Sequence, residues 1–343
     1  MAAAEGLDGV VVALTRLSHV DGDAGELIIA GQPVERLAAE ATFEQACALL
    51  WDVPKVNLGP ARVAAFERLA SLGTALKASD GMDALRAAVA HLPQESTKEE
   101  VTAAVGVFVA AWARKGAAIA PDPTASHASD LLRMMRGEPA PEPLVQGLNA
   151  YLVTVTDHGM NASTFASRVI ASTGSDLVSA IVGGIGALKG PLHGGAPGPV
   201  LDMLDAVGSP GNAEAWLTAE LAAGRRIMGM GHRIYRVRDP RAAVLEKTVE
   251  RLEAAGVSTG RLTLARAVER AATQVLARKY PDRSLQANVE FYTAVLLDTL
   301  GLPRGAFTPM FAAGRVAGWA AHVDEQKRTG RLIRPASRYA RDP

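Results

Sequence analysis

Hydrophobic and polar positions follow the period of an α-helix along most of the chain. From residue 34 onward apolar residues recur at helical spacing, interrupted by joints rich in Pro, Gly and Ser at 92–97, 119–126, 137–143 and 208–212. One segment differs. Asp21-Gly22 and Gly25 lie between short apolar runs, the second at 26–30, which indicates a small hairpin or meander. The pattern predicts a mostly α-helical protein with a short N-terminal β-hairpin.

Three helix boundaries follow from residue chemistry. Thr308-Pro309 offers an N-cap oxygen followed by proline, which predicts a helix from 309 to about 326. Lys189-Gly190-Pro191 joins a cation, a glycine and a proline, a pattern typical of a helix end. Asn288 is interpreted as the start of a further helix with Glu290 in its first turn.

Composition and charge exclude several classes of protein. Lys and Arg number 36 and Asp and Glu also 36, which argues against a general nucleic-acid binder. A single cysteine, Cys47, excludes an internal disulfide or a multi-cysteine metal site. The start lacks the features of a secretory signal, and the longest apolar stretch, 101–113, is shorter than the roughly 20 residues that span a bilayer. We therefore expect a soluble, cytoplasmic protein with neither nucleic-acid nor membrane partners.

Glycine is unusually dense at 183–198. A P-loop ends in Gly-Lys-Ser/Thr, whereas Lys189 is followed by Gly190-Pro191, and a dinucleotide fingerprint requires a preceding strand where the pattern here is helical. We interpret Gly183, Gly184 and Gly186 as helix positions without side chains, where neighbouring elements can pack close to the backbone. That interpretation leaves the nearby His193 unexplained, because it lies in a turn that ends a helix.

Three of the seven histidines lie next to glycine in short polar turns: His158, His193 and His232. Neither an HExxH motif nor an i, i+4 pair of histidines occurs, so no zinc site is predicted. Each histidine alone fits a capping or core role, but three in glycine turns are candidates for one site. The remaining four show no such context and are interpreted as structural: His19, His91, His127 and His322.

Arg315 has largely apolar neighbours at helical spacing, namely Phe311, Ala312, Gly318 and Trp319. A guanidinium on that face is partly buried, and an unpaired buried charge costs several kcal/mol. It therefore requires a carboxylate. The sequence leaves open whether that carboxylate belongs to the protein or to a ligand.

Two further segments permit two interpretations each. Glu290 has mostly neutral neighbours one turn away, so burial would raise its pKa toward the range of a general base, yet a first-turn glutamate also suits the helix dipole. The segment 231–241 holds four arginines, which fit either a solvated loop or the recognition of a polyanion.

Taken together and in order, these segments resemble the citrate synthase family. The resemblance covers nearly the whole chain, from Gly6 to Tyr339. It rests on HGMNASTF at 158–165, IGALKGPLHGGA at 185–196, MGMGHR at 228–233, DPRA at 239–242, NVEFY at 288–292 and FTPMFAAGRVAGWAAHVDEQ at 307–326.

The resemblance implies an almost all-α fold in two parts. A large helical domain would comprise residues 1–194 and 302–343, and a small domain, 195–301, would close over the active-site cleft. It also implies a homodimer with shared active sites, and a reaction without metal or redox cofactor.

The family reaction condenses acetyl-CoA with oxaloacetate and hydrolyses the thioester to citrate and CoA. The resemblance implies that His193 polarises the thioester carbonyl, Glu290 removes the methyl proton and His232 protonates the oxaloacetate carbonyl. The remaining assignments are oxaloacetate binding by His158, Arg241, Arg315 and the partner subunit's Arg334, and CoA binding by Met228, Gly229, Met230, Gly231, Arg236 and Arg283.

One departure and two alternatives accompany this resemblance. Many family members have Asp where this chain has Glu290, whose extra methylene changes the geometry of the base but keeps the carboxylate. One alternative is 2-methylcitrate synthase, which uses propionyl-CoA, because an apolar pocket discriminates one methylene by only about 1–3 kcal/mol. The other is a catalytically silent helical dimer that binds CoA.

Overall fold

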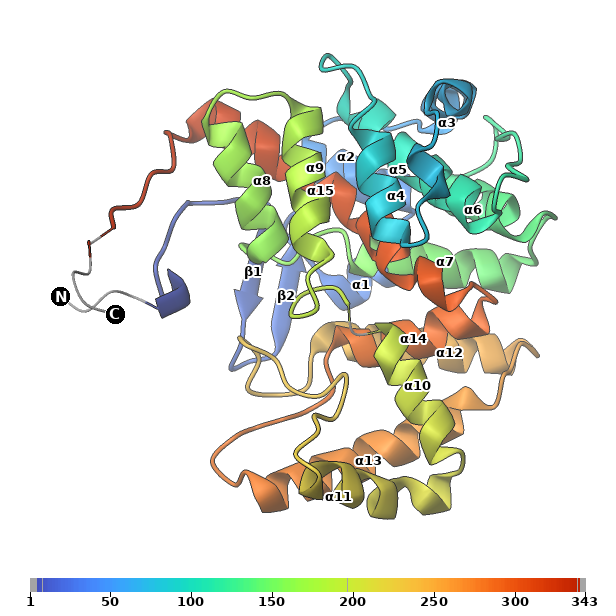
Figure 1. The fold of residues 1–343 in the computed structure, drawn as a ribbon, viewed down its shortest axis with the longest axis vertical. Coiled ribbons are helices and arrows are strands. Elements are labelled where there is room, and N and C mark those ends of the chain that lie inside the picture. The colour runs from blue at the N-terminus through green and yellow to red at the C-terminus, as the bar shows by residue number, and fades with distance from the viewer. Residues whose placement is uncertain (1–4, 8, 196, 338, 340–343) are drawn as a thin grey trace.

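The computed structural model describes residues 5–7, 9–195, 197–337 and 339, so both ends of the predicted large domain, at 1–4 and 340–343, lie outside the described residues. Helices make up most of the described chain, accompanied by one three-stranded sheet (Figure 1). The predicted mostly α-helical fold is confirmed. Within the described ranges, no helix is both long and apolar enough to cross a membrane.

The predicted N-terminal hairpin is confirmed as an antiparallel meander of β1 (Ser18–Asp21), β2 (Glu26–Ile29) and β3 (Gln32–Pro33). In the β1–β2 turn, the Asp21 carboxylate accepts hydrogen bonds from the backbone N–H groups of Asp23 at 3.0 Å and Ala24 at 2.8 Å. Such a side-chain bond to residues just ahead fixes a tight turn.

Nine helices between the sheet and residue 189 form the upper part of the molecule in Figure 1. The predicted joints at 92–97 and 119–126 fall between helices, whereas that at 137–143 overlaps the first two residues of α7. The helices are α1 (Val34–Glu40), α2 (Phe43–Trp51), α3 (Gly59–Glu67), α4 (Gly81–Val89), α5 (Lys98–Ala113), α6 (His127–Arg136), α7 (Glu142–Thr154), α8 (Ala162–Ser172) and α9 (Leu177–Leu188).

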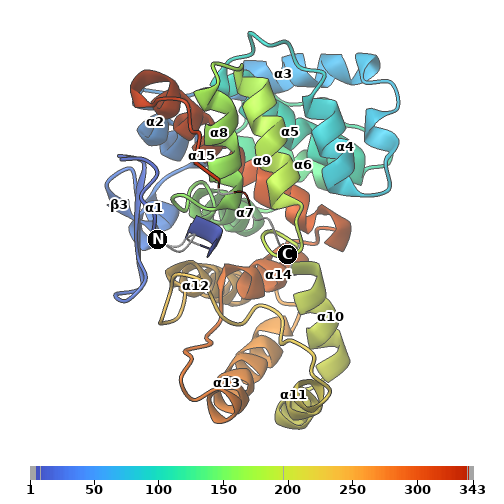
Figure 2. The same ribbon diagram turned by 60° about the vertical axis from the view of Figure 1, so that its left-hand side comes forward.

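Five further helices lie between α9 and the last helix. In both ribbon views α10, α11 and α13 lie below the first nine helices, and α12 and α14 lie between the two groups (Figures 1 and 2). The predicted domain boundaries at 195 and 301 stay a prediction. The helices are α10 (Pro197–Val207), α11 (Ala213–Ala222), α12 (Pro240–Ala254), α13 (Arg261–Lys279) and α14 (Val289–Thr299).

The last helix, α15 (Phe307–Thr329), runs through the core and packs on α5, α7, α8 and α9. It begins two residues before the predicted Pro309, because the short 3₁₀ turn Arg304–Ala306 leads directly into it. Thr308 is therefore not the N-cap, and its hydroxyl donates instead to the Gly194 carbonyl at 2.9 Å. Pro309 remains compatible, since the first-turn N–H groups of a helix have no partner within it.

The other predicted boundaries are confirmed. Helix α9 ends at Leu188 with Lys189 as its C-cap, and Asn288 caps α14 by accepting from the Glu290 N–H at 3.1 Å. Gly183 and Gly184 pack closely, since a methyl on Gly184 would lie 3.1 Å from a Trp319 ring carbon. The interpretation is wrong for Gly186, which has no described atom within 4 Å of a methyl placed on it.

Candidate functional site

Three turns and three helices bring the predicted catalytic and oxaloacetate-binding side chains together, Arg334 excepted. The turns follow α7 and α9 and precede α12, and the helices are α12, α14 and α15. The six residues are His158, His193, His232, Arg241, Glu290 and Arg315.

His158 lies at the centre of this group. Its ring centroid is 5.4 Å from that of His232, and its Nε2 lies 3.1 Å from the Tyr235 hydroxyl. Burial, reinforced by the positive charges of Arg241 and other nearby residues, lowers the pKa of His158 well below its usual value. His158 is therefore neutral at pH 7 and serves as a hydrogen-bonding group rather than a charge.

The tautomer of His193 follows from its contacts. Its Nε2 accepts from the backbone N–H of Ser163 at 3.3 Å and lies 2.8 Å from the Ser163 hydroxyl. Because a backbone N–H can only donate, the neutral ring carries its proton on Nδ1. Burial lowers the pKa of His193 to about 4, with Arg315 adding to the effect. His193 thus offers one neutral N–H donor at neutral pH.

His232 is held in the opposite tautomer. Its Nδ1 accepts from the backbone N–H groups of Ile234 at 3.0 Å and Tyr235 at 3.1 Å, which leaves the proton on Nε2. Burial lowers its pKa to about 4. An Arg241 amino group lies 3.4 Å from this Nε2, and because both groups are donors, neither satisfies the other. The pair suits an acceptor oxygen placed between them.

Arg241 is buried and held by Asp239. Its Nε and Nη2 donate to the two Asp239 oxygens at 3.0 Å and 2.8 Å. Asp239 also caps α12 through the Arg241 N–H and accepts from the Val289 N–H at 3.1 Å, in the first turn of α14. One carboxylate therefore fixes both the arginine and the start of the helix that carries Glu290.

Arg315 is 1% exposed and forms no salt bridge with any described carboxylate. Its Nε donates to the Val155 carbonyl at 2.6 Å, its guanidinium lies over the Phe311 ring at 5.0 Å, and its Nη2 is buried without a described partner. Burial lowers the pKa of Arg315 to about 10, opposed by the charge of Asp157. Of the two alternatives the sequence left open, the structural ion pair is not found among the described residues, so the geometry favours a ligand carboxylate.

Glu290 faces the same group from the first turn of α14. Burial raises its pKa to about 8, while the charge of Arg241 lowers it and that of Asp239 raises it. Within the described chain no side-chain or backbone group donates a hydrogen bond to its carboxylate, and its backbone N–H donates to the Asn288 side chain. A half-buried acid with a raised pKa and no fixed partner has the properties of a general base.

The segment 228–231 pairs with 286–288 and so joins the His232 loop to the start of α14. The Gly231 N–H donates to the Gln286 carbonyl at 2.7 Å, and the Asn288 N–H donates to the Gly229 carbonyl at 2.9 Å. The Asn288 side chain also donates to the Gly231 carbonyl at 2.9 Å. This short ladder sets the spacing between His232, one residue after its first side, and Glu290, two residues after its second side.

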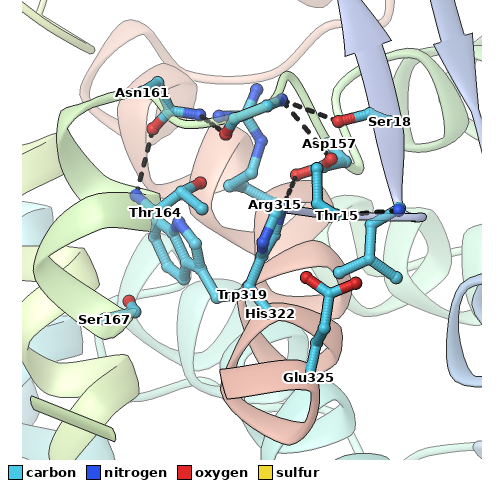
Figure 3. A network of polar contacts seen from close by, with 12 residues as sticks. Thr15, Ser18, Asp157, Asn161, Thr164, Ser167, Arg315, Trp319, His322 and Glu325 are labelled. Atoms are coloured by element: carbon cyan, nitrogen blue, oxygen red, sulfur yellow. Dashed lines mark hydrogen bonds and ion pairs between the residues drawn. The ribbon is translucent and has the colours of Figure 1, made fainter. Parts of the chain in front are cut away.

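A buried polar network around Asp157 and His322 lies beside Arg315 (Figure 3). His322, interpreted from sequence as structural, lies 3.1 Å from Asp157 through its Nε2, and its Nδ1 accepts from Arg168 at 2.8 Å. Arg168 in turn donates to Glu325 at 2.7 Å. Burial alone would raise the pKa of Asp157, but His322 and a hydrogen bond from Ser18 bring it below its usual range. Asp157 therefore supplies a fixed negative charge near Arg315.

Sequence reasoning missed several residues that this geometry assigns to the site: Ser163, Asp157, Tyr235, Asp239 and His322. For some of them a signal was present. Asp157 directly precedes His158, Tyr235 follows His232 by three residues, and Asp239 occupies the N-cap position before Pro240. Nothing in the sequence pointed to Ser163 or His322 as partners, because each acts on a group from a distant segment.

The remaining predicted residues lie elsewhere in the chain. Arg236 and Arg283 are exposed, and Met228 is partly buried beside the 228–231 ladder, so their CoA assignment stays a prediction. Arg334 is exposed on the extended C-terminal segment, where it lines a hollow with N-terminal residues such as Val10 and Leu14. No group of three or more metal-ligating side chains occurs within the described ranges.

Comparison with known proteins gives consistent results. The family model described as citrate synthase, C-terminal domain, matches residues 6–336. A citrate synthase of Haloferax volcanii is 36% identical over 97% of this chain and 94% of its own. A 2-methylcitrate synthase of Mycobacterium tuberculosis is also 36% identical, over 98% of this chain and 90% of its own.

The solved structures agree with the sequence matches. A ternary complex of carboxymethyl coenzyme A and oxaloacetate with the citrate synthase of the thermophilic archaeon Thermoplasma acidophilum has a TM-score of 0.89 and 27% sequence identity. The match covers 99% of this chain and 96% of that one. The fold implied by the sequence resemblance is confirmed.

Proposed function

Because this chain belongs to the citrate synthase family, and so is an acyltransferase, we propose that it condenses acetyl-CoA with oxaloacetate and hydrolyses the citryl-CoA thioester to citrate and CoA. One observation carries the proposal. Two neutral histidines with opposite fixed tautomers each present one N–H donor, in the same group as a half-buried carboxylate with a raised pKa. Enolisation of a thioester followed by attack on a ketone requires these three functions.

The first step uses Glu290 and His193. The Glu290 carboxylate takes a proton from the acetyl methyl group, and the electron pair of that C–H bond moves toward the thioester oxygen. That oxygen accepts a hydrogen bond from Nδ1–H of His193, a neutral donor already oriented by Ser163. Removing one such preorganised donor typically costs about 3–4 kcal/mol of transition-state stabilisation.

The second step uses His232. The nucleophilic carbon attacks the ketone carbon of oxaloacetate, and the ketone oxygen takes the proton from Nε2 of His232. The tautomer fixed by Ile234 and Tyr235 places a proton on this nitrogen. Water then cleaves the thioester of the citryl-CoA, which releases citrate and free CoA.

The two carboxylates of oxaloacetate would bind Arg315 and Arg241, with His158 as a neutral donor. The unpaired Nη2 of Arg315 and the facing donors of Arg241 and His232 support this assignment. Arg241 belongs to the predicted small domain and Arg315 to the large one, so the substrate would draw the two together before acetyl-CoA binds. Calorimetry should show an acetyl-CoA analogue binding weakly alone and tightly with oxaloacetate. Equal affinity in both conditions would contradict this order.

CoA would then bind along 228–231 with Arg236 and Arg283. Both arginines are exposed and form no salt bridge within the described part of the chain, so their charges are available to the CoA phosphates. Replacing either arginine by Ala should raise the KM for acetyl-CoA and leave that for oxaloacetate unchanged.

We assign the active unit as a homodimer in which the partner subunit's Arg334 completes each site. Apolar side chains on the terminal segments support this, because Val11 is 80%, Leu14 89% and Leu332 58% exposed in the single chain. Arg334→Ala and His193→Ala, each inactive alone, should recover partial activity as a mixed dimer. Purified heterodimers without activity would contradict a shared site.

Measuring the release of CoA identifies which acyl-CoA the enzyme uses. We expect thiol release from acetyl-CoA only when oxaloacetate is present, and a smaller kcat/KM for propionyl-CoA. A higher kcat/KM for propionyl-CoA would assign the chain as a 2-methylcitrate synthase, in keeping with its relative from Mycobacterium tuberculosis. A lack of release from either substrate, in protein that still binds CoA, would support the catalytically silent alternative.

A further inference from the structure

The turn of the N-terminal hairpin, residues 21–25, lies on the loop that carries His232. The Gly22 carbonyl accepts a hydrogen bond from the Arg236 N–H at 2.8 Å, although the two residues are more than two hundred positions apart. Figures 1 and 2 show the hairpin reaching from the upper part of the molecule to the loop between α11 and α12. We call residues 21–25 the hairpin tip and residues 232–238 the histidine loop.

The contact is between backbones and leaves no room for a side chain at Gly22. A methyl there would overlap the Ile234 carbonyl oxygen and lie 2.9 Å from the carbonyl carbon. At Gly25, where φ is +71°, a methyl would lie 2.6 Å from the Val237 side chain. Gly22 itself has no positive φ, so the close approach alone excludes a larger residue there.

The peptide groups that meet the hairpin tip also orient His232. The Ile234 N–H donates to His232 Nδ1, and the carbonyl of the same residue abuts Gly22. The Tyr235 N–H donates to the same Nδ1, and its hydroxyl lies 3.1 Å from His158. Displacing 234–236 would therefore rotate the imidazole of His232 and separate it from His158.

Most side chains of the histidine loop contribute little burial to hold it in place. Tyr235 is buried and Arg238 pairs with Glu246 and Glu269, but Arg233 and Arg236 are exposed, Ile234 is 46% exposed and Val237 38% exposed. Loops with few buried contacts open at low free-energy cost. The hairpin, in contrast, is anchored by buried contacts. Leu27 and Ile29 lie in the hydrophobic core, and the Ser18 hydroxyl accepts a hydrogen bond from the Gly159 N–H at 2.9 Å.

We propose that the hairpin tip, acting through Gly22, positions His232 for catalysis by docking against the backbone of residues 234–236. The hairpin joins two of the three histidine turns of the site, with its base at His158 and Gly159 and its tip at the histidine loop. Gly22 is a positioning residue, since it touches neither substrate. The inference rests on the proposed function, because it assigns the proton donor to His232.

The test is a double-mutant cycle of Gly22→Ala with His232→Ala. Misplacing a catalytic group by about 1 Å can cost on the order of 10²-fold. We therefore expect Gly22→Ala to lower kcat by about 10- to 100-fold in the wild-type background and by less than about 3-fold in the His232→Ala background. Equal losses in both backgrounds, or an unchanged kcat, would overturn the proposal.

Matched controls separate docking from general damage. Gly211→Ala adds a methyl where no described atom lies within 4 Å, and Asp23→Ala alters the same turn at an exposed side chain. Both should keep the wild-type kcat. If Gly22→Ala does not fold, Val237→Ala replaces it as the test variant, because removing the Val237 methyl groups loosens the contact with the hairpin tip without a clash. A several-fold lower kcat at an unchanged melting temperature supports the proposal, and a wild-type kcat overturns it.

Hydrogen exchange distinguishes this inference from the proposed function. Amides of the histidine loop should exchange at least tenfold faster in Gly22→Ala than in wild type, whatever reaction the enzyme performs. Faster exchange without any effect of His232→Ala on CoA release would mean that the docking is right and the catalytic assignment wrong. Unchanged exchange would overturn the docking itself.

Discussion

Two buried charged regions of this molecule are built in opposite ways. Between α3 and α6, Arg62 of α3 is 0% exposed and donates to Asp130 of α6 at 2.7 Å and to the carbonyls of Asp122 and Ala125. At the site, Arg315 is equally buried, but among the described residues the Val155 carbonyl is its one hydrogen-bond acceptor, and Glu290 has no described donor to its carboxylate. We call the first region the Arg62 pair and the second the Arg315–Glu290 group.

Under the proposed function, the difference separates charges that hold the fold from ionisable groups kept for a ligand. A buried ion pair is compensated within the protein, and removing one partner destabilises the fold. Arg315 has no ion-pair partner among the described residues, although the charge of Asp157 acts on it, and under the proposed function a substrate carboxylate would compensate it. The two regions should therefore respond oppositely to neutralisation, in stability and in activity.

The largest expected effect is on the chemistry at Glu290. Glu290→Gln keeps the shape and removes the proton acceptor, so turnover should fall by about 10²–10⁴-fold, as is typical of losing a general base. The turnover of Glu290→Asp should lie between those of wild type and Glu290→Gln, because the carboxylate survives but is set back by one methylene. Exchange of the methyl protons of an unreactive acetyl-CoA analogue, followed by NMR in deuterated water, isolates this step.

Asp130→Asn is the matched change in the Arg62 pair. It should lower the free energy of unfolding and leave the turnover of the folded enzyme unchanged. Methyl exchange in Glu290→Gln at the wild-type rate would show that another group is the base, and so would remove the contrast between the regions.

The next largest effect compares the two arginines. Arg62→Met should cost about 3 kcal/mol of unfolding free energy, because it leaves the buried Asp130 with Arg133 as its one described ion-pair partner. Arg315→Met should keep or raise stability, yet weaken oxaloacetate binding by about 10²-fold, since a hydrogen bond to a charged group contributes about 1.5–3 kcal/mol. Urea unfolding and calorimetry with oxaloacetate measure the two quantities. A destabilised Arg315→Met would mean that this arginine has a structural role.

The smallest effect is a pH dependence of stability. The folded-state pKa of Glu290 is about 8 against an ordinary 4.5, so the folded protein binds the extra proton and loses stability as pH rises from about 4.5 to 8. Glu290→Gln lacks this loss. Its melting temperature should exceed that of wild type by about 2–5 °C at pH 8.5, with no difference near pH 4.5. A constant offset across this range would contradict a raised pKa.

Much of the fold follows from local chemistry, which the sequence displays directly. The β1–β2 turn, the end of α9 at Lys189 and the start of α14 at Asn288 each depend on residues within a few positions of one another. The predicted start of α15 was wrong because a contact with a distant segment overrode the local signal. The Thr308 hydroxyl, a suitable N-cap by itself, finds the Gly194 carbonyl from another segment.

The sequence by itself determined which side chains are candidates for the chemistry: three histidines in glycine turns, a first-turn glutamate and an arginine on an apolar helix face. Only the tertiary structure decided their chemical states. Ser163 sets the tautomer of His193 from 30 residues away, Asp239 holds the start of α14 from 50 residues away, and Val155 meets Arg315 across 160 residues. Tautomer, pKa and charge compensation depend on neighbours that packing brings together, and neighbours so distant in sequence leave no periodic or local pattern in it.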